Sequence, residues 1–182
     1  MANPSSSTAH SEPIQDFSHC HDGIVSKLEM LGELPDLLAP AARARNIAEN
    51  AVAFFQVAIF EHHQDEEREL FPAVLASAEP GEEMAQVKAM VKRLTDEHRE
   101  LEGLWKQLES GLKKLAKGQA SDINVAEIQR LVTQYKAHAS YEETEFLPLS
   151  QTILGRNANH MSALGLSLHM RHTPVNVNAT YI

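Results

Sequence analysis

Residues 62–72 read HHQDEERELFP, and residues 138–148 repeat the pattern as HASYEETEFLP. Each copy has a histidine, a glutamate four residues later, a second glutamate, and then two large apolar residues and a proline. On an α-helix, a residue and its fourth neighbour differ by about 40° in azimuth and about 6 Å in height. His62 with Glu66, and His138 with Glu142, therefore project from one helical face as adjacent donors. Two such pairs can hold two cations.

The repeat is wider than this motif, because a lone histidine precedes each copy. His21 and His98 each lie about 40 residues before the motif histidine of their half of the chain. Both interrupt rows of apolar residues with helical spacing, such as Ile24 and Leu28 after His21. The sequence therefore predicts two helical hairpins, each with a lone histidine on its first helix and His-x-x-x-Glu on its second.

Helix-breaking residues set the expected bounds of four helices. The first helix is expected from residue 14 to 31, the second over 41–70 with Pro40 in its first turn, and the third over 87–115. Asp122 or Asn124 can cap the fourth. Pro72 is expected to end or kink the second helix, and Pro148 to close the fourth.

The register of the second helix separates its two consecutive histidines. The inner row of this helix includes Phe55, His62, Glu66 and Leu70. His62 continues that row, and His63 is expected to fall to one side.

Length and composition favour one all-α domain. The chain has 182 residues and 43% hydrophobic content, enough for one full core. We expect a disordered segment over residues 1–12, a helical bundle over 13–150 and a C-terminal extension over 151–182. Within the extension, residues 157–171 are expected to form a short fifth helix that caps the bundle or meets a second copy of the chain in a homodimer.

Charge and cysteine content exclude several classes of function. The net charge of −9 and the lack of a basic block argue against a nucleic-acid partner. The single cysteine, Cys20, rules out an internal disulfide framework and suits a reducing compartment. No signal pattern and no run of 18 or more apolar residues occurs. We therefore expect a cytoplasmic protein with no membrane partner.

A lone histidine in an apolar row is more often a hydrogen-bonded core residue than a metal ligand. Four such histidines, two of them followed by a glutamate one turn later, favour the metal site instead. Carboxylates are costly to bury without a cation or a proton, and no lysine or arginine lies in the inner rows. Imidazole and carboxylate ligands suit iron, with manganese or zinc as lesser possibilities, and two carboxylates suit a pair of ions.

From about residue 14 to 150 the chain resembles the haemerythrin-like HHE cation-binding domains. The resemblance is carried by His21, His62, Glu66, His98, His138 and Glu142, and by the apolar pair and proline after each motif. It implies an up-down-up-down four-helix bundle around a non-haem di-iron centre. It also implies that Glu66 and Glu142, with an oxo or hydroxo group, bridge the two irons. One iron would then bind His21 and His62, and the other His98 and His138.

The chain departs from the oxygen-carrying haemerythrins at one position. Those proteins resemble this chain but have a further histidine one turn after the histidine of the third helix, where this chain has Glu102. Glu102 is either a surface residue or a ligand, and as a ligand it would favour the ferric state over reversible oxygen carriage. The site of His21 and His62 has fewer ligands, so it is where we expect an open position for dioxygen, peroxide or nitric oxide.

The resemblance leaves the function open between binding and catalysis. The leading hypothesis is a di-iron protein that binds or senses a small ligand. The alternatives are a redox enzyme, for peroxide disposal or repair of iron centres, and iron storage. Repair relatives carry an additional cysteine-containing N-terminal module, which Cys20 alone does not supply.

Overall fold

The computed structural model describes residues 13–55 and 59–156, and residues 13–20 in their backbone only. The described residues form helices and the turns between them, with no strand among them, so the predicted all-α class is confirmed. The disordered segment expected over residues 1–12 and the fifth helix expected over residues 157–171 lie outside the described residues. The contacts divide the chain into two compact units, Met1–Asn46 and Ile47–Ile182, and each is described by itself.

The first unit contains α1 (Pro13–Gly32) and the first part of α2 (Leu34–Phe54), which crosses the boundary between the units. The predicted bounds of α1 are close to those observed. The predicted long connection to the next helix is wrong, because helix resumes at Leu34, after a turn in which the Glu33 N–H donates to the carbonyl of Met30. Pro35 fits the first turn of α2, where its missing N–H has no partner to lose. Pro40 therefore lies inside α2 and not at its start.

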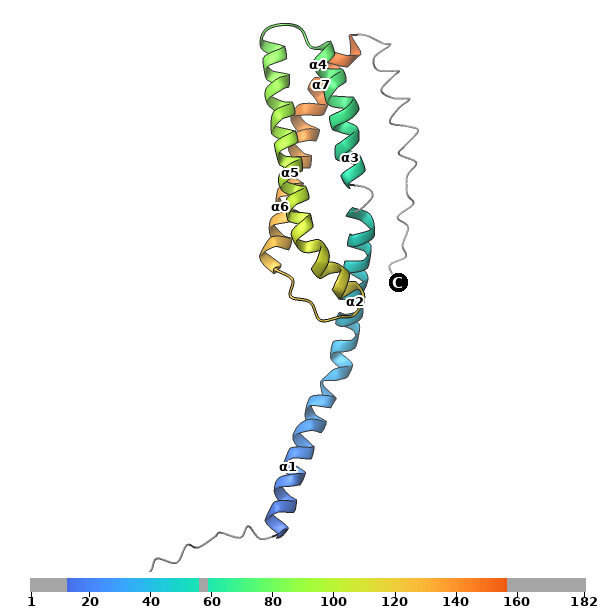
Figure 1. Ribbon diagram of the computed structural model, residues 1–182, viewed down its shortest axis with the longest axis vertical. Coiled ribbons are helices and arrows are strands. Elements are labelled where there is room, and N and C mark those ends of the chain that lie inside the picture. The colour runs from blue at the N-terminus through green and yellow to red at the C-terminus, as the bar shows by residue number, and fades with distance from the viewer. Residues whose placement is uncertain (1–12, 56–58, 157–182) are drawn as a thin grey trace, which may run out of the picture. The chain divides into compact units, whose positions relative to one another are not determined.

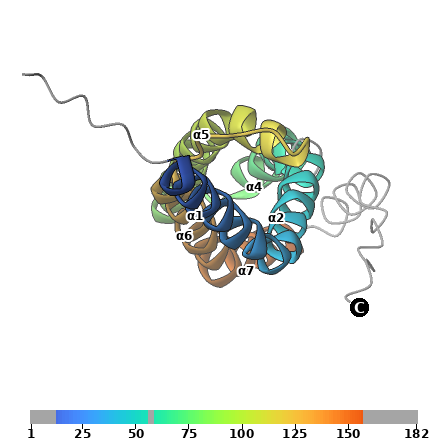
Figure 2. The same cartoon turned by 90° about the horizontal axis from the view of Figure 1, so that it is seen from below.

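The described part of the second unit contains the end of α2 and, after it, three helical rods that run alternately up and down (Figure 1). The first rod consists of α3 (Phe60–Asp65), the π-helical turn η2 (Glu66–Leu70) and α4 (Phe71–Ser77). The second is the long helix α5 (Glu82–Ala116). The third consists of α6 (Val125–Tyr141), the π-helical turn η3 (Glu142–Phe146) and α7 (Leu147–Gly155). Seen along the rods, α4, α5, α6 and α7 surround a common centre (Figure 2).

The turns between the rods follow the expected chemistry. Gly81 begins α5 with a φ of 112°, and Gly118 follows α5 with a φ of 70°, a backbone region that favours glycine. Of the two candidate caps for α6, the structure selects Asn124, whose side chain accepts a hydrogen bond from the N–H of Ala126 at 3.0 Å.

Both motif copies contain a π-helical turn directly after their α-helical start, which the sequence analysis did not predict. In each turn the residue before the proline donates its N–H to a carbonyl five residues back, Phe71 to Glu66 and Leu147 to Glu142. The wider turn relieves the clash that a proline causes in an α-helix. Pro72 and Pro148 therefore sit in the first turns of α4 and α7. The expectation that Pro148 closes its helix is wrong, and so is the first of the two alternatives for Pro72, that it ends its helix.

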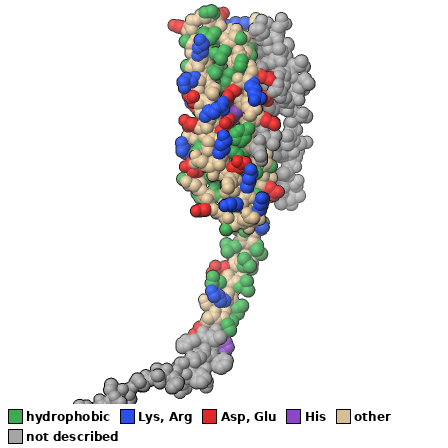
Figure 3. Space-filling model, in the orientation of Figure 1, with side chains coloured by type: hydrophobic (Ala, Val, Ile, Leu, Met, Phe, Trp, Pro, Cys, Tyr) green, Lys and Arg blue, Asp and Glu red, His purple; other side chains and the backbone are tan. Residues whose placement is uncertain are grey.

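Two apolar clusters form the core of the second unit. Their fully buried members are Leu70, Phe71, Val74, Ala78, Val87, Met90, Leu94, Phe146, Ile153 and Leu154 in one cluster, and Leu101, Leu104, Trp105, Leu108 and Leu131 in the other. Along α5, Leu94 belongs to the first cluster and Leu101 to the second, so His98 lies between them. The outer face of this unit, in contrast, mixes acidic and basic side chains (Figure 3). The apolar clusters thus enclose a polar layer at the height of His98.

Candidate metal centre

The polar layer contains buried histidines and glutamates from all three rods. The fully buried members are His63, Glu66, His98, His138 and Glu142. His62 joins them from the edge, with 43% of its side chain exposed. The two π-helical turns begin at Glu66 and Glu142, so each turn presents its first carboxylate to this layer.

These donors form two groups of three. His63, His98 and His138 make one group, and His62, Glu66 and Glu142 make the other. Within each group, one donor atom from each residue lies within 4.8 Å of the others, which is close enough for one ion to contact all three. One group is therefore rich in imidazole and the other in carboxylate.

Glu66 contacts both groups. Its Oε1 lies 3.2 Å from His62 Nε2, and its Oε2 lies 3.3 Å from His98 Nε2. Glu142 reaches the imidazole group as well, with its Oε2 4.0 Å from His138 Nε2. A carboxylate that faces two donor groups with different oxygens can bridge two cations.

His63 is a candidate ligand that the sequence analysis missed. The side chain expected to fall to one side is 1% exposed, and its ring stacks on that of His98 at a centroid distance of 3.9 Å. The prediction extended one helical register across residues 41–70, but α2 ends at Phe54 and α3 begins at Phe60. The spacing could have predicted this position, since His63 lies three residues before Glu66 and so shares a helical face with it.

Two other predicted ligands lie outside the two groups. Glu102 sits beside the imidazole group, with its Oε1 3.5 Å from His63 Nδ1 and 3.3 Å from Arg99 Nη1. His21 lies on α1, in the first unit. Their coordination of metal stays a prediction.

Burial and mutual contact perturb the pKa values of these donors. Burial, then the neighbouring His98, lowers the pKa of His63 to about 3. Burial and a hydrogen bond to Glu66 raise the pKa of Glu142 to about 9. Burial alone would raise the pKa of Glu66, but its contacts with His98 and Glu142 outweigh burial and lower the pKa to about 2. In the metal-free protein, Glu66 and Glu142 therefore share one proton, and Glu142 carries it at neutral pH.

The donors fit a cation because many of them have no other partner. Both ring nitrogens of His63, Nε2 of His98, Nε2 of His138 and Oε2 of Glu66 are buried without a hydrogen bond among the described residues. Leaving such an atom unsatisfied costs about 1–3 kcal/mol. Metal ions bind imidazole nitrogens and carboxylate oxygens by their lone pairs, so metal would satisfy one ring nitrogen of each histidine and the Glu66 oxygen together.

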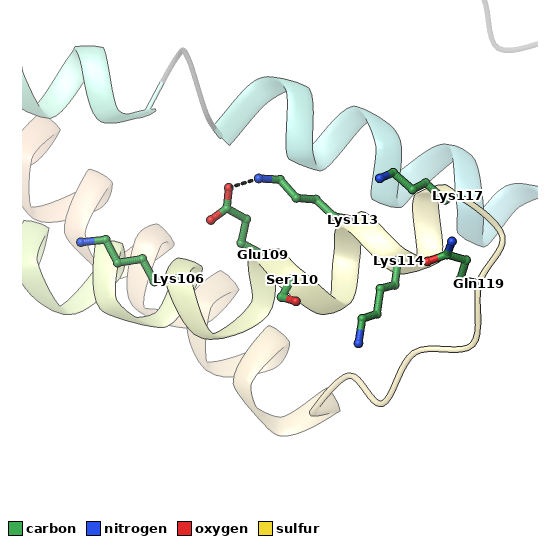
Figure 4. Close-up of a pocket in the computed structure, with 7 residues that line it drawn as sticks. All are labelled: Lys106, Glu109, Ser110, Lys113, Lys114, Lys117 and Gln119. Carbon is green, nitrogen blue, oxygen red and sulfur yellow. Dashed lines mark hydrogen bonds and ion pairs between the residues drawn. The ribbon is translucent and has the colours of Figure 1, made fainter.

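A surface hollow along the C-terminal half of α5 offers no comparable arrangement. It measures about 370 Å³ and is lined by Lys106, Glu109, Ser110, Lys113, Lys114, Lys117 and Gln119. Its lysines point in different directions, and Lys113 is paired with Glu109 at 2.7 Å (Figure 4).

The described helices also include none that is both long and apolar enough to span a membrane.

Metal binding should release a proton from Glu142. Its pKa of about 9 keeps it protonated at neutral pH, and an ion at its oxygen displaces that proton, whereas His63, with a pKa of about 3, is already neutral. Calorimetric titration with manganese(II) in buffers of different ionisation enthalpy should therefore show a release that decreases as pH rises from about 7 towards about 9. A release that does not change over this range would contradict the assignment of the proton to Glu142.

Comparison with known proteins identifies the family of the chain. The family model of the hemerythrin HHE cation binding domain matches residues 12–150. An uncharacterized protein of Haemophilus influenzae is 30% identical over 159 residues, which cover 84% of this chain and 89% of that protein. No solved structure is significantly similar to the chain. The chain belongs to the family of hemerythrin HHE cation-binding domains.

Proposed function

We propose that the chain is a non-haem di-iron protein that binds or senses a small ligand such as dioxygen, nitric oxide or peroxide. The observation that carries this proposal is the set of buried, unpartnered donor atoms grouped on both sides of Glu66. The donors divide into two separate groups of three, so two ions are expected. Mixed imidazole and carboxylate donors suit iron better than the softer metals that prefer thiolates.

The two donor groups would hold the two ions. His63, His98 and His138 would bind one, and His62, Glu66 and Glu142 the other, with Glu66 placed to bridge them. His21 remains a predicted further ligand, and Glu102 lies near enough to His63 to join its group after a small side-chain movement. Iron would supply a redox-active Lewis acid to which the small ligand could bind. The protein residues supply its position and a surrounding that excludes bulk water.

We expect the small ligand to bind at the ion held by the donor group of His62, Glu66 and Glu142. His62 is the one member of either group with a substantially exposed side chain, so this group lies nearest to solvent. The three histidines of the other group are all almost fully buried. Access from outside therefore favours the ion held by His62, Glu66 and Glu142.

Visible absorption of the iron-loaded protein tests this proposal. The spectrum should change when dioxygen, hydrogen peroxide or nitric oxide is added to the reduced protein under anaerobic conditions. His62→Ala should reduce that change, and Lys106→Ala, in the remote lysine-lined hollow, should not. If the protein binds two irons but its spectrum does not change with any of the three ligands, the result would favour iron storage.

A further inference from the structure

Two imidazoles of the candidate centre each contact a carboxylate from a neighbouring rod. Glu67 Oε1 lies 2.8 Å from His98 Nδ1, and Glu97 Oε2 lies 2.9 Å from His138 Nδ1. An ionised carboxylate only accepts hydrogen bonds, so the hydrogen in each pair must be on Nδ1. In the neutral ring, Nε2 then keeps its free lone pair.

The free lone pairs lie in the donor groups. His98 Nε2 is 3.3 Å from Glu66 Oε2, and His138 Nε2 is 4.0 Å from Glu142 Oε2. Both Nε2 atoms are buried without a hydrogen bond among the described residues. Each ring is therefore held by one nitrogen, and its other nitrogen faces the centre.

An arginine holds each carboxylate by its second oxygen. Arg99 Nη2 binds Glu67 Oε2, and Arg93 Nε lies 2.8 Å from Glu97 Oε1. The guanidinium of Arg93 also stacks over the ring of Tyr141, 3.5 Å from its centroid. Both arginines are about half exposed, so these ion pairs add little to stability, and their main effect is on carboxylate orientation.

The same order of groups, arginine to carboxylate to imidazole, thus occurs twice. It does not occur at every histidine of the candidate centre. His63 has no such partner, since its closest carboxylate oxygen, Oε1 of Glu102, is 3.5 Å from Nδ1, and both of its ring nitrogens lack a hydrogen bond. The arrangement is confined to His98 and His138.

We propose that Glu67 and Glu97 are positioning residues, which fix the tautomer and the ring orientation of His98 and His138 before metal binds. The inference rests on the proposed metal function, because it explains how two ligands are kept ready for an ion. Carboxylates that accept from the outer nitrogen of a ligating histidine also raise the basicity of the other nitrogen, and their loss costs about 10–100-fold in metal affinity. Glu67 and Glu97 act through the imidazoles and do not themselves contact the ion.

The first readout is the tautomer in the metal-free, full-length protein. Ring ¹⁵N chemical shifts, recorded at a pH above the titration of the histidines, should place the hydrogen of His98 and His138 on Nδ1. In Glu67→Ala the hydrogen of His98 should redistribute to Nε2, and in Glu97→Ala that of His138 should do so. The corresponding Gln variants keep an acceptor oxygen, so they should keep the original tautomer.

The second readout is affinity for zinc(II) alone, measured by competition with a chelator. Each Ala variant should bind zinc about 10–100-fold more weakly, and each Gln variant should lose less because it removes only the charge. Asp96→Asn is the matched control, because Asp96 precedes Glu97 on α5, is exposed and pairs with Lys92 in the same i, i+4 geometry. Its affinity should stay within about twofold of the parent.

Unchanged tautomers in both Ala variants would overturn the inference. If an Ala variant does not fold, the parent protein decides, since a hydrogen on Nε2 of His98 or His138 in the metal-free parent would equally overturn the inference. The result also separates the inference from the function on which it rests. Tautomers that follow the carboxylates, in a parent protein that binds no metal, would uphold the positioning and overturn the di-iron function.

Discussion

Replacing His63 by alanine is expected to weaken metal binding by at least about 100-fold, because even an outer partner of a metal ligand contributes about 10–100-fold. His63 is buried within the imidazole group, with its ring stacked on His98 and close to His138. Its pKa of about 3 keeps it neutral, so one ring nitrogen offers a lone pair over the whole physiological range. Anaerobic titration with iron(II), followed by metal analysis, measures the loss.

Two comparisons separate ligand loss from damage to the fold. His62→Ala removes a half-exposed donor from the other group, so it should lower the occupancy of one ion and leave the imidazole group able to bind. Added imidazole should restore binding to His63→Ala if the cavity that the substitution leaves is intact. An iron affinity of His63→Ala within about twofold of the parent would mean that His63 is a packing residue and not a metal ligand.

Removing the metal is expected to lower the melting temperature by about 5–10 °C. A ligand at about 100 times its Kd stabilises the folded state by about 2.7 kcal/mol, and about 1 kcal/mol shifts the Tm of a chain of this size by about 2–4 °C. Without metal, three imidazoles and two carboxylates face one another between the two apolar clusters. Circular dichroism melts before and after chelation test this. An unchanged Tm, with metal loss confirmed, would contradict the coupling of metal to fold.

The metal-free protein should have its greatest stability in mildly acidic solution. Glu142, whose pKa is raised from 4.5 to about 9, gains a proton on folding, so its contribution increases as pH falls from about 9 to 4.5. His63, whose pKa is lowered from 6.5 to about 3, resists protonation in the folded state, so its contribution is lost as pH falls below 6.5. Glu142→Gln should remove the increase on the alkaline side. Urea unfolding of both proteins across this range measures the effect.

The repeated motif was enough to predict the helices and much of the centre. A histidine with a glutamate one turn later predicted that Glu66, His138 and Glu142 would face inward, and all three are buried. Helical spacing likewise placed His98 in the core row of α5. These predictions rely on local geometry alone, which an unbroken helix preserves.

Other features depend on departures from regular helix and on neighbouring rods. A constant period of 3.6 residues over 41–70 places only His62 in the inner row, whereas His62 and the more deeply buried His63 both belong to donor groups. The π-helical turns keep helix going past Pro72 and Pro148. The contacts of Glu67 with His98 and of Glu97 with His138 join different rods, so they depend on how the rods are rotated about their axes. No sequence pattern records that rotation.

Metal stoichiometry tests the central claim most directly. The full-length protein should be loaded with iron(II) under anaerobic conditions, freed of unbound metal, and analysed for iron and protein in the same sample. Two donor groups joined by Glu66 predict about two irons per chain, and about one in a His62→Ala, Glu142→Ala double variant that keeps only the imidazole group intact. One iron or none in the parent protein would contradict the account.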